Sequence, residues 1–427
     1  MILRVSPSLI SGQISAPSSK SLSQRFIAAS LLAGEPTKIY GLSDCNDSTA
    51  ALEIASNLGA EIDLGPNAIL ITPSPNGIPS PRTTSLSAGE SGLSFRMFSA
   101  FIALCNEQIT FTGHGSLLSR DQTLISSGLL ALGVQSTSTQ GKPPLTITGP
   151  IPGGEITIDG SNGSQFLTGL LLALPYADID STIHVKNLVS RPYVEMTLEV
   201  MSTFDLDFTH EENEDEDIYH IPCNQSALGG EFAIDGDWSA AASLLVLGAL
   251  CGRPELEVTG IRGDFTQADS AIKGALLFAG YHLLGTDEGL SVKKKRPKPL
   301  NLDLTNSPDL FPTLAALAVF SNKPSRFRGV HRLENKESSR AIVLQSEFKK
   351  AGIIIDIEGD TMIVHPGKPT SCRINPNGDH RIAMAAAILG CAGCADVEIL
   401  NAECVAKSYP TFFEDLASIG GIVEEVK

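Results

Sequence analysis

A short pattern of helix, turn and strand recurs six times along the chain, and this repetition restricts the possible folds more than any other feature. The turn positions lie 68 to 75 residues apart, and five of the six are glycine, the residue favoured just after the last turn of a helix. They are Gly59, Gly133, Asp205, Gly280, Gly352 and Gly420. The spacing predicts six copies of one α/β unit.

Each copy also contains a second helix that is apolar on nearly all sides, which is typical of a buried helix. These helices are expected at 20–32, 91–104, 164–174, 237–250, 308–319 and 380–389. A chain of 427 residues is too long for one ordinary core, so we expect two closed domains of three units each, with a boundary near 224–230. The acidic run 211–217 before this boundary is interpreted as a solvated loop, and the basic run 293–296 as surface.

Composition excludes several classes of protein. The net charge of -17 argues against a general nucleic-acid surface. Apolar stretches such as 382–395 are shorter than the roughly 20 residues that span a bilayer, and residues 1–10 lack the apolar core of a signal peptide. The eight cysteines are scattered, which indicates free thiols in a reducing cytoplasm, and Cys391 and Cys394 are interpreted as buried helix residues. We therefore expect a cytoplasmic protein with no nucleic-acid or membrane partner.

Cations stand at the entrances of several buried helices, where the positive end of the helix dipole disfavours them. The first helix opens with Lys20 and contains Arg25 two turns in, the second contains Arg96, and the sixth opens with Arg381. Helix capping accounts for serine and aspartate at such positions but not for lysine and arginine. Repeat symmetry would gather three helix N-termini at one end of each domain, which predicts a site for anions.

Two carboxylates accompany these cations. Asp309 precedes the fifth buried helix, and Glu337 lies between Lys336 and Arg340. A pair of carboxylates whose pKa values are set by nearby cations could perform acid and base chemistry. An exposed Lys-Glu pair is more often a surface ion pair of little energetic value, so both interpretations remain open at this point.

Nine segments, in this order and spacing, resemble the EPSP synthase family of the enolpyruvyl transferases. They are SSKSLSQR, ESGLSFR, LLSRD, GSQFLT, SRPY, SPDLFPTLA, ENKESSR, GDHRIAMA and AKSYPTFF. The resemblance covers nearly the whole chain. It implies an α/β fold of two domains, each built from three βαβαββ repeat units in an inside-out α/β barrel. The N-terminal strand would join the second domain, so the domains would be residues 17–230, and residues 1–16 plus 231–427.

The resemblance also implies a reaction. The enolpyruvyl group of phosphoenolpyruvate (PEP) would pass to the 5-hydroxyl of shikimate 3-phosphate through a tetrahedral intermediate that loses phosphate. This transferase step belongs to the shikimate pathway of chorismate and aromatic amino-acid biosynthesis. No metal or organic cofactor would be needed, and we expect a monomer.

Roles for individual residues follow from the matching motifs. Asp309 would accept the hydroxyl proton, Glu337 would deliver and remove the C3 proton, and Lys20 would be the third catalytic residue. The shikimate 3-phosphate site would contain Lys20, Ser21, Arg25, Ser164, Gln165, Ser190, Tyr193, Asp309 and Lys336. The PEP site would contain Lys20, Gly92, Arg120, Gln165, Arg340, Arg381 and Lys407. Asp379 and His380 would hold Arg381 in position without contacting the substrates themselves.

The chain departs from the family pattern near the phosphate and PEP subsites. Glu90 replaces a usual asparagine and is expected to pair with Arg96 or Arg120. Leu93 stands where threonine is common, and Gly163 replaces a serine that contacts the sugar phosphate. These changes leave substrate affinities and the response to glyphosate open.

Two alternatives compete with this reading. The sister enzyme that acts on UDP-N-acetylglucosamine typically carries Lys-Asn where this chain has Lys20-Ser21, and a reactive cysteine that is missing around 118–121. A non-catalytic paralogue that binds anionic ligands would be favoured by loss of Asp309, Glu337 or Lys20, and all three are present.

Overall fold

The computed structural model describes residues 1–74 and 77–426 and divides the chain into two compact units. Unit 1 comprises Met1–Pro17 and Asp235–Lys427, and unit 2 comprises Ser18–Ile234. The chain therefore passes from one unit to the other twice. Each unit is described by itself below.

Unit 2 contains three four-stranded sheets among its described residues. The first is ordered β14 (Glu231–Ala233), β3 (Thr37–Tyr40), β5 (Ala68–Thr72) and β4 (Glu61–Leu64). The second is ordered β6 (Ser85–Ser87), β7 (Gln108–Thr112), β9 (Lys142–Thr148) and β8 (Gln135–Thr139). The third is ordered β10 (Gly154–Asp159), β11 (Ser181–Lys186), β13 (Glu216–Ile221) and β12 (Thr209–Glu212).

Unit 1 repeats this arrangement over its own described residues. Its first sheet is ordered β2 (Ile10–Ser15), β15 (Gly252–Thr259), β17 (Gly289–Val292) and β16 (Leu283–Gly285). The second is ordered β18 (Asn301–Asp303), β19 (Ser325–Arg328), β21 (Thr361–Val364) and β20 (Ile355–Glu358). The third is ordered β22 (Cys372–Ile374), β23 (Val397–Leu400), β1 (Ile2–Ser6) and β24 (Ile422–Glu425). In all six sheets the first two strands are parallel and the other neighbours antiparallel. This common order confirms the predicted α/β fold with repeated units.

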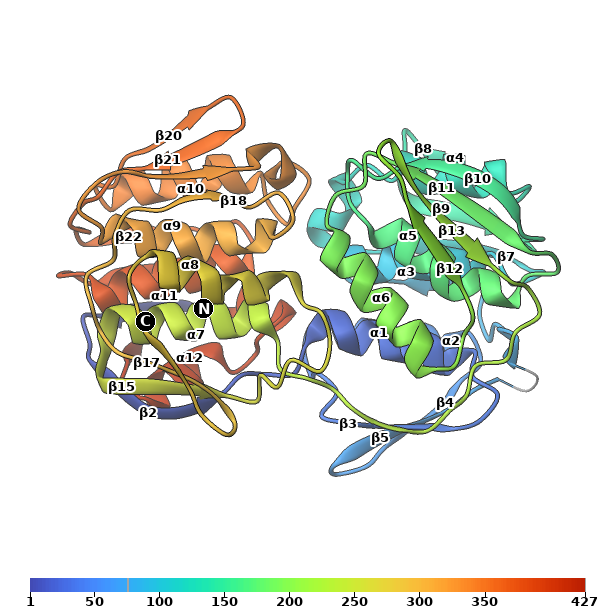
Figure 1. The fold of residues 1–427 in the computed structure, drawn as a ribbon, viewed down its shortest axis with the longest axis horizontal. Helices are drawn as coiled ribbons and strands as arrows, with labels where there is room; N and C mark the ends of the chain where they lie inside the picture. Colours follow the sequence, from blue (N-terminus) through green and yellow to red (C-terminus); the bar gives the residue numbers. More distant parts are fainter. Residues whose placement is uncertain (75–76, 427) are drawn as a thin grey trace. The chain divides into compact units, whose positions relative to one another are not determined.

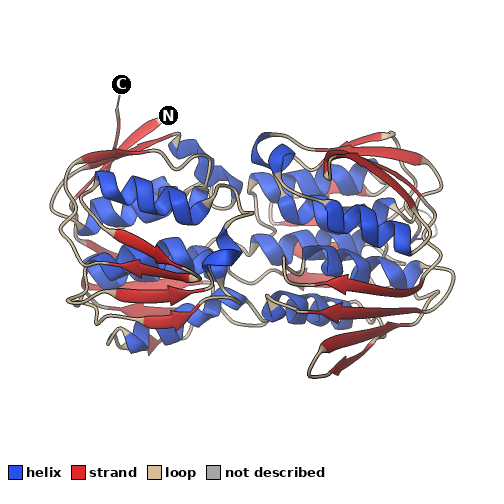
Figure 2. Ribbon diagram, turned by 90° about the horizontal axis from the view of Figure 1, so that it is seen from above, coloured by secondary structure: helices blue, strands red, loops and turns tan. Residues whose placement is uncertain are grey.

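Six buried helices lie where the sequence predicts them. They are α1 (Lys20–Leu31), α3 (Gly92–Ile102), α5 (Gln165–Ala173), α7 (Trp238–Cys251), α9 (Phe311–Val319) and α11 (His380–Ala392). In unit 1, α7, α9 and α11 pack against one another and form the centre of the core (Figure 1). Each unit contains both helices and strands (Figure 2), and nearly all residues of these six helices are buried, as expected of helices that are apolar on all sides.

The outer helices bury a smaller share of their residues than the inner helices do. They are α2 (Asn46–Asn57), α4 (Thr123–Ala131), α6 (Arg191–Thr203), α8 (Ile272–Phe278), α10 (Arg340–Lys350) and α12 (Phe412–Ser418). The six predicted turn residues follow them, and all have positive φ angles, from 58° at Asp205 to 115° at Gly59. Glycine adopts such angles without steric cost, which explains why the turn residue recurs as glycine.

The structure corrects three expectations. The predicted boundary at 230 is too early, because β14 pairs with β3 and therefore completes a sheet of unit 2. The acidic run 211–217 is only partly a solvated loop: residues 211–215 are exposed, but the run forms the β12–β13 hairpin, and Asp217 at its end is only 1% exposed. Cys391 is buried as expected, but Cys394 lies beyond α11 and is exposed. Across the part of the chain that is described, the helices are not long and apolar enough to span a membrane.

Candidate active site

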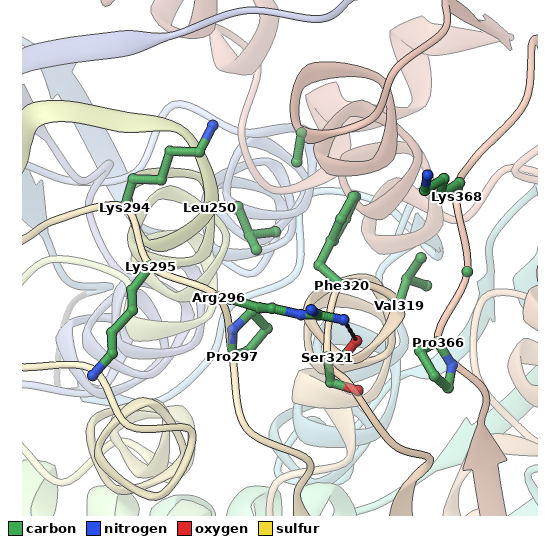
Figure 3. Close-up of a pocket in the computed structure, with 12 residues that line it drawn as sticks. Leu250, Lys294, Lys295, Arg296, Pro297, Val319, Phe320, Ser321, Pro366 and Lys368 are labelled. Atoms are coloured by element: carbon green, nitrogen blue, oxygen red, sulfur yellow. Dashed lines mark hydrogen bonds between the residues drawn. The ribbon is translucent and has the colours of Figure 1, made fainter.

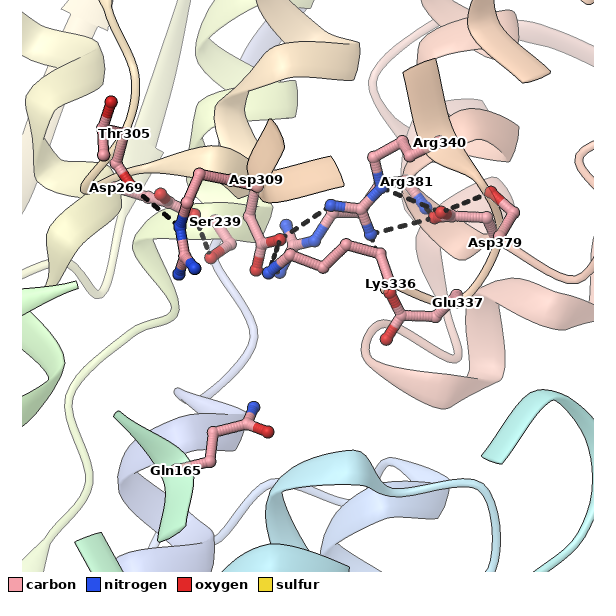
Figure 4. Close-up of polar contacts among 12 residues, drawn as sticks. Gln165, Ser239, Asp269, Thr305, Asp309, Lys336, Glu337, Arg340, Asp379 and Arg381 are labelled. Atoms are coloured by element: carbon pink, nitrogen blue, oxygen red, sulfur yellow. Dashed lines mark hydrogen bonds and ion pairs between the residues drawn. The ribbon is translucent and has the colours of Figure 1, made fainter. Parts of the chain in front are cut away.

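Three cations near the N-terminal ends of α10 and α11 in unit 1 surround Asp309 (Figure 4). Asp309 lies in the short helix η5 (Pro308–Leu310), directly before α9. Its Oδ1 is 2.8 Å from Arg340 Nη1 and 3.3 Å from Lys336 Nζ, and its Oδ2 is 3.0 Å from Arg381 Nη2. Arg340 opens α10 in the same repeat as Asp309, and Arg381 lies in the first turn of α11 in the next repeat, so two repeats contribute to one cluster.

The cations keep Asp309 ionised. Burial by itself would raise the pKa of this carboxyl, but Arg381, Lys336 and Arg340 together hold its pKa well below the usual range. For Lys336, burial lowers the pKa of the ammonium, and the nearby Asp309 opposes that shift. The free site therefore holds a carboxylate that is a weak base and a lysine that loses its proton more easily than an exposed one.

Arg340 is the centre of the network and is completely buried. Its Nη2 donates to Glu337 Oε2 at 2.8 Å, and its Nε donates to Asp379 Oδ2 at 2.9 Å. Burial would lower the pKa of this guanidinium, but Asp379, Asp309 and Glu337 raise it above the usual range. Arg340 thus fixes Glu337 and Asp309 on one guanidinium group.

Asp379 contacts both Arg381 and Arg340. Its Oδ1 accepts from the backbone N–H of Arg381 at 3.0 Å and caps α11, while its carboxylate binds the side chain of Arg340. The predicted support of Arg381 by this acid stays a prediction, and its contact with Arg340 was not expected. His380 is 1% exposed beside it.

Lys407, the remaining predicted residue of unit 1, is buried at the end of η7 (Ala402–Lys407). This short helix packs against α11, the helix that carries Arg381. The structure thus brings together Asp309, Lys336, Glu337, Arg340 and Arg381 by direct contacts and places Lys407 on a neighbouring element.

Sequence reasoning missed Asp269. This residue lies in η4 (Ala268–Ala271), is 2% exposed, and accepts a hydrogen bond from Ser239 Oγ, in the first turn of α7. Its Oδ1 has no hydrogen-bond partner among the described residues. Burial, together with the negative charge of Asp309, raises the pKa of Asp269 to about 6, although Arg381 opposes this. The signal in the sequence is its place before the fourth outer helix, which is where Arg120 and Lys336 lie in other repeats.

Unit 2 also collects cations at its helix entrances. Lys20 is the first residue of α1, and its Nζ is 3.2 Å from Asp47 Oδ2 in α2. Ser19 caps α1 by accepting from the backbone N–H of Leu22. Ser21 follows Lys20 in the first turn and is partly exposed. The entrance therefore presents an ammonium group and a hydroxyl, with Asp47 compensating the charge.

Arg25 is 1% exposed and is hydrogen-bonded within unit 2. Its Nε donates to Thr197 Oγ1 at 2.9 Å, and its Nη2 donates to Thr168 Oγ1 at 3.2 Å and to the carbonyl of Tyr193 at 3.0 Å. Burial lowers its pKa to about 10, and Tyr193 opposes the shift. Arg25 therefore ties α1 to α5 and α6, and its predicted contact with a substrate stays a prediction.

Gly92 opens α3 against two guanidinium groups. A Cβ at this position would lie 2.7 Å from Arg120 Nη1 and 3.3 Å from Arg96 Nη1, so the backbone is approached more closely than a side chain allows. Arg96 in turn donates to Gln165 Oε1 at 2.6 Å and to Gln122 Oε1 at 3.0 Å. Gln165 is the first residue of α5, so this pair joins two helix entrances.

The remaining predicted residues of unit 2 lie at the entrances of α5 and α6. Ser164 is 3% exposed at the N-cap position of α5 and makes no side-chain capping bond. Ser190 holds the N-cap position of α6 in the left-handed region, with φ 60°, and Tyr193 lies in the first turn of that helix. Gly163 has φ 130°, which strains any other residue, so glycine here also meets a backbone requirement.

The departures from the family pattern have local partners. Glu90 Oε1 lies 3.6 Å from His114 Nδ1, an ion pair when the imidazole is protonated. Leu93 is 7% exposed, within α3. The predicted pairing of Glu90 with Arg96 or Arg120 stays a prediction.

A separate pocket of about 590 Å³ lies at the opposite ends of the buried helices of unit 1 (Figure 3). It is lined by Leu250, Val319 and Ala392, which are the last residues of α7, α9 and α11 or adjoin them. The basic run 293–296 contributes side chains to its rim and is exposed, as expected. Cations complement the carbonyl ends of helices, which accounts for these lysines without a ligand.

The charges of the predicted site residues in unit 1 and in unit 2 indicate what chemistry they can perform. Each set presents lysine and arginine at helix N-termini, and the set in unit 1 adds two carboxylates held on Arg340. Such an arrangement can bind carboxylate and phosphate groups and can transfer protons. Within residues 1–74 and 77–426, no group of three or more His, Cys, Asp or Glu side chains is placed to hold a metal ion.

Comparison with known proteins agrees with this chemistry. The family model described as EPSP synthase (3-phosphoshikimate 1-carboxyvinyltransferase) matches residues 5–416. A 3-phosphoshikimate 1-carboxyvinyltransferase of Methanocorpusculum labreanum is 34% identical over 428 residues, covering 100% of both chains. One of Methanocella arvoryzae is 33% identical and covers 99% of this chain and 100% of the relative.

Solved structures show the same fold. The EPSP synthase of Acinetobacter baumannii has a TM-score of 0.81 at 23% identity, covering 99% of this chain and 100% of that one. The enolpyruvyl transferase NikO of Streptomyces tendae has a TM-score of 0.78 at 16% identity, covering 100% of this chain and 98% of that one.

Proposed function

The chain belongs to the EPSP synthase family, and from this premise we propose that it transfers the enolpyruvyl group of PEP to the 5-hydroxyl of shikimate 3-phosphate, releasing phosphate. The observation that carries the proposal is the cluster of Arg340, Arg381 and Lys336 around Asp309. Cations at helix N-termini oppose the helix dipole, and their cost is offset when anionic substrates bind there.

PEP is proposed to bind to the lysines and arginines that the matching motifs assign to the PEP site. Arg340 and Arg381 are planar forks that match a carboxylate or phosphate, and Lys407 lies on the element packed against α11. The other residues that the matching motifs assign to PEP are in unit 2: Lys20, Arg120, Gln165 and the backbone at Gly92. The closeness of Arg120 to Gly92 supports the last of these, since a larger residue would displace the guanidinium.

Shikimate 3-phosphate is proposed to bind mainly to unit 2. Lys20, Ser21 and Arg25 would hold one end of the molecule, and Ser164, Gln165, Ser190 and Tyr193 would hold the rest. Apart from Arg25, which lies in the second turn of α1, these residues open α1, α5 and α6 or lie in their first turns, so they present backbone N–H groups as well as side chains. Asp309 and Lys336 would contact the hydroxyl groups where the new bond forms.

Asp309 is proposed to become a base only when PEP binds. In the free site its carboxylate is paired with three cations, which keeps its pKa low and its basicity weak. The carboxylate and phosphate of PEP would bind those same cations and place negative charge near Asp309. Both effects raise the pKa of Asp309, so the carboxylate gains the ability to accept the proton of the 5-hydroxyl.

This step can be tested by proton uptake. PEP binding would be measured by calorimetry in buffers of different ionisation enthalpy at about pH 5.5, with a shikimate 3-phosphate analogue that lacks the 5-hydroxyl. Uptake of protons in the wild-type chain, and none in Asp309→Asn, is expected. Equal proton uptake in both chains would contradict the assignment to Asp309.

Glu337 is proposed to protonate C3 of PEP and later to remove a proton from the same carbon. Its carboxylate is held 2.8 Å from Arg340 Nη2, on the guanidinium that also binds Asp309. The two carboxylates are therefore fixed relative to each other, as an addition at one carbon and a proton transfer at its neighbour require. The intermediate would collapse with loss of phosphate.

The experiment that tests the function is phosphate release by the purified chain. PEP would be supplied with shikimate 3-phosphate, with UDP-N-acetylglucosamine, or alone, and phosphate would be measured over time. Release that depends on shikimate 3-phosphate is expected. Release that depends on the nucleotide sugar would move the chain to the sister activity, and no release in any mixture would favour a paralogue that only binds anions.

The setting of the enzyme is part of the proposal. We expect a monomer in the cytoplasm that needs no cofactor and binds no nucleic acid; the net charge of -17 supports the last point. Sedimentation of the purified chain tests the monomeric state. Activity that survives dialysis against a chelator is expected, and its loss would contradict the absence of a metal requirement.

A further inference from the structure

The β12–β13 hairpin, taken from the sequence for a solvated loop, is tied to the entrance of α6. Asp217 on β13 is 1% exposed, and its Oδ1 lies 2.5 Å from Arg191 Nη1 and 3.1 Å from His210 Nε2. Glu212 on β12 adds a second carboxylate 3.2 Å from the same Arg191 nitrogen. His210 is itself fixed by stacking on Tyr219, with ring centroids 4.4 Å apart.

The position of Arg191 in the chain explains why it is paired with carboxylates. It is the first residue of α6, where the helix dipole disfavours a cation. The hydrogen bond that Arg191 donates to Asp217 outweighs the cost of burial and raises the pKa of the guanidinium. The hairpin thus supplies the negative charge that stabilises Arg191 at the N-terminus of α6.

The same helix entrance carries two residues of the proposed shikimate 3-phosphate site. Ser190 precedes Arg191 in a left-handed conformation that serine adopts only when its surroundings impose it. Tyr193 follows two residues later, and its carbonyl accepts from Arg25. The first turn of α6 is thus held on one side by α1 and on the other by the hairpin.

We propose that Asp217, through its buried contact with Arg191, is a positioning residue that fixes Ser190 and Tyr193 for shikimate 3-phosphate. This inference rests on the proposed function. The residue touches no substrate itself, so its loss would weaken binding of that one substrate rather than slow the chemical steps.

The test compares Asp217→Asn with wild type in steady-state kinetics. The variant keeps the size of the side chain and removes its charge. KM for shikimate 3-phosphate is expected to rise about tenfold, while kcat and KM for PEP stay within about twofold. The matched control is Asp215→Asn, an exposed acid in the turn of the same hairpin, which is expected to behave as wild type.

Because Asp217 is buried, its variant could lose stability, so Arg191→Met is made as well. Arg191 is about one-third exposed, and its loss removes the same contact from the other side. Both single variants and the double variant should show the same rise in KM, because all three lack one contact. Calorimetric titration with shikimate 3-phosphate should show the same loss of affinity without turnover.

An unchanged KM for shikimate 3-phosphate in both folded variants would overturn the inference. A fall in kcat with unchanged KM would also overturn it, since that pattern belongs to a residue of the chemical step. A wild-type chain that shows no turnover would refute the proposed function instead, and this outcome is visible before any variant is made.

Discussion

Replacement of Asp309 by asparagine tests whether one carboxylate serves both as counter-ion and as base. The change preserves shape and removes the charge that Arg340, Arg381 and Lys336 approach to 2.8, 3.0 and 3.3 Å. Removing one partner from a buried ionic network costs about 3 kcal/mol, because the remaining cations repel one another. For a unit of this size that corresponds to a fall in Tm of about 6 to 12 °C. Loss of a general base lowers kcat by about 10²- to 10⁴-fold.

The dependence on pH gives a second measurement of the same carboxylate. The pKa of Asp309 is depressed in the folded chain, so its ionisation stabilises the fold at any pH above the unfolded pKa of about 4. This stabilisation is lost as the pH falls from that value through the folded pKa. The difference in unfolding free energy between wild type and Asp309→Asn should therefore be constant from about pH 5 to 8 and shrink below about pH 4.

The assays are thermal unfolding and phosphate release on the same preparations. The control is Asp303→Asn, which removes an acid of β18 whose ion pair with Arg328 is long, 3.8 Å, and exposed; it should cost less than about 1 kcal/mol and leave kcat unchanged. An Asp309→Asn chain that is as stable as wild type would refute the counter-ion reasoning. One that keeps more than about a tenth of kcat would remove Asp309 from the chemistry.

Three further predictions concern single positions. Gly92→Ala should raise KM for PEP with a smaller effect on KM for shikimate 3-phosphate, because a Cβ would lie 2.7 Å from Arg120 Nη1; steady-state kinetics measures this, and equal KM values in wild type and variant would contradict it. Asp205→Gly should stabilise unit 2 by about 0.5 to 1 kcal/mol, since the turn has φ 58°; a lower midpoint in chemical unfolding would contradict it. Asp269→Asn should be more stable than wild type at pH 7 by on the order of 1–3 kcal/mol, because the raised pKa of this acid means that its ionisation, between about pH 4 and 6, destabilises the fold. That advantage should vanish below about pH 4, and an advantage independent of pH would show that the carboxyl does not titrate there.

Periodic apolar character was the most reliable guide to the fold. The buried helices are apolar all round, so their positions could be predicted to within three residues at either end, counting η5 with α9. Residues 211–217 of the hairpin were predicted to be a loop because Asp217, a charged residue, occupies one of the buried positions of β13, which alternate with more exposed ones. A charged residue on the buried face interrupts the alternation of apolar and polar residues that predicts a strand. Its burial is explained only when its ion-pair partner, here Arg191, is known.

The site was partly visible in the sequence for a similar reason. Cations are unexpected at helix N-termini, so Lys20 and Arg381 could be singled out without a structure. Asp269 was missed, because its only signal is its place before an outer helix, where an acid is ordinary, and the fold brings it near Asp309. The internal hydrogen bonds of Arg25 were equally invisible, since they depend on how α5 and α6 pack against α1.

The most direct test of the central claim is the reaction run in D₂O and followed by proton NMR. Addition and elimination through a C3 methyl group predicts that deuterium enters the vinyl group of the enolpyruvyl product when PEP and shikimate 3-phosphate are both present. It also predicts that Glu337→Gln, once its folding has been verified by circular dichroism, incorporates at least about 10²-fold more slowly. Product formed without deuterium, or incorporation unaffected by Glu337→Gln, would contradict the account.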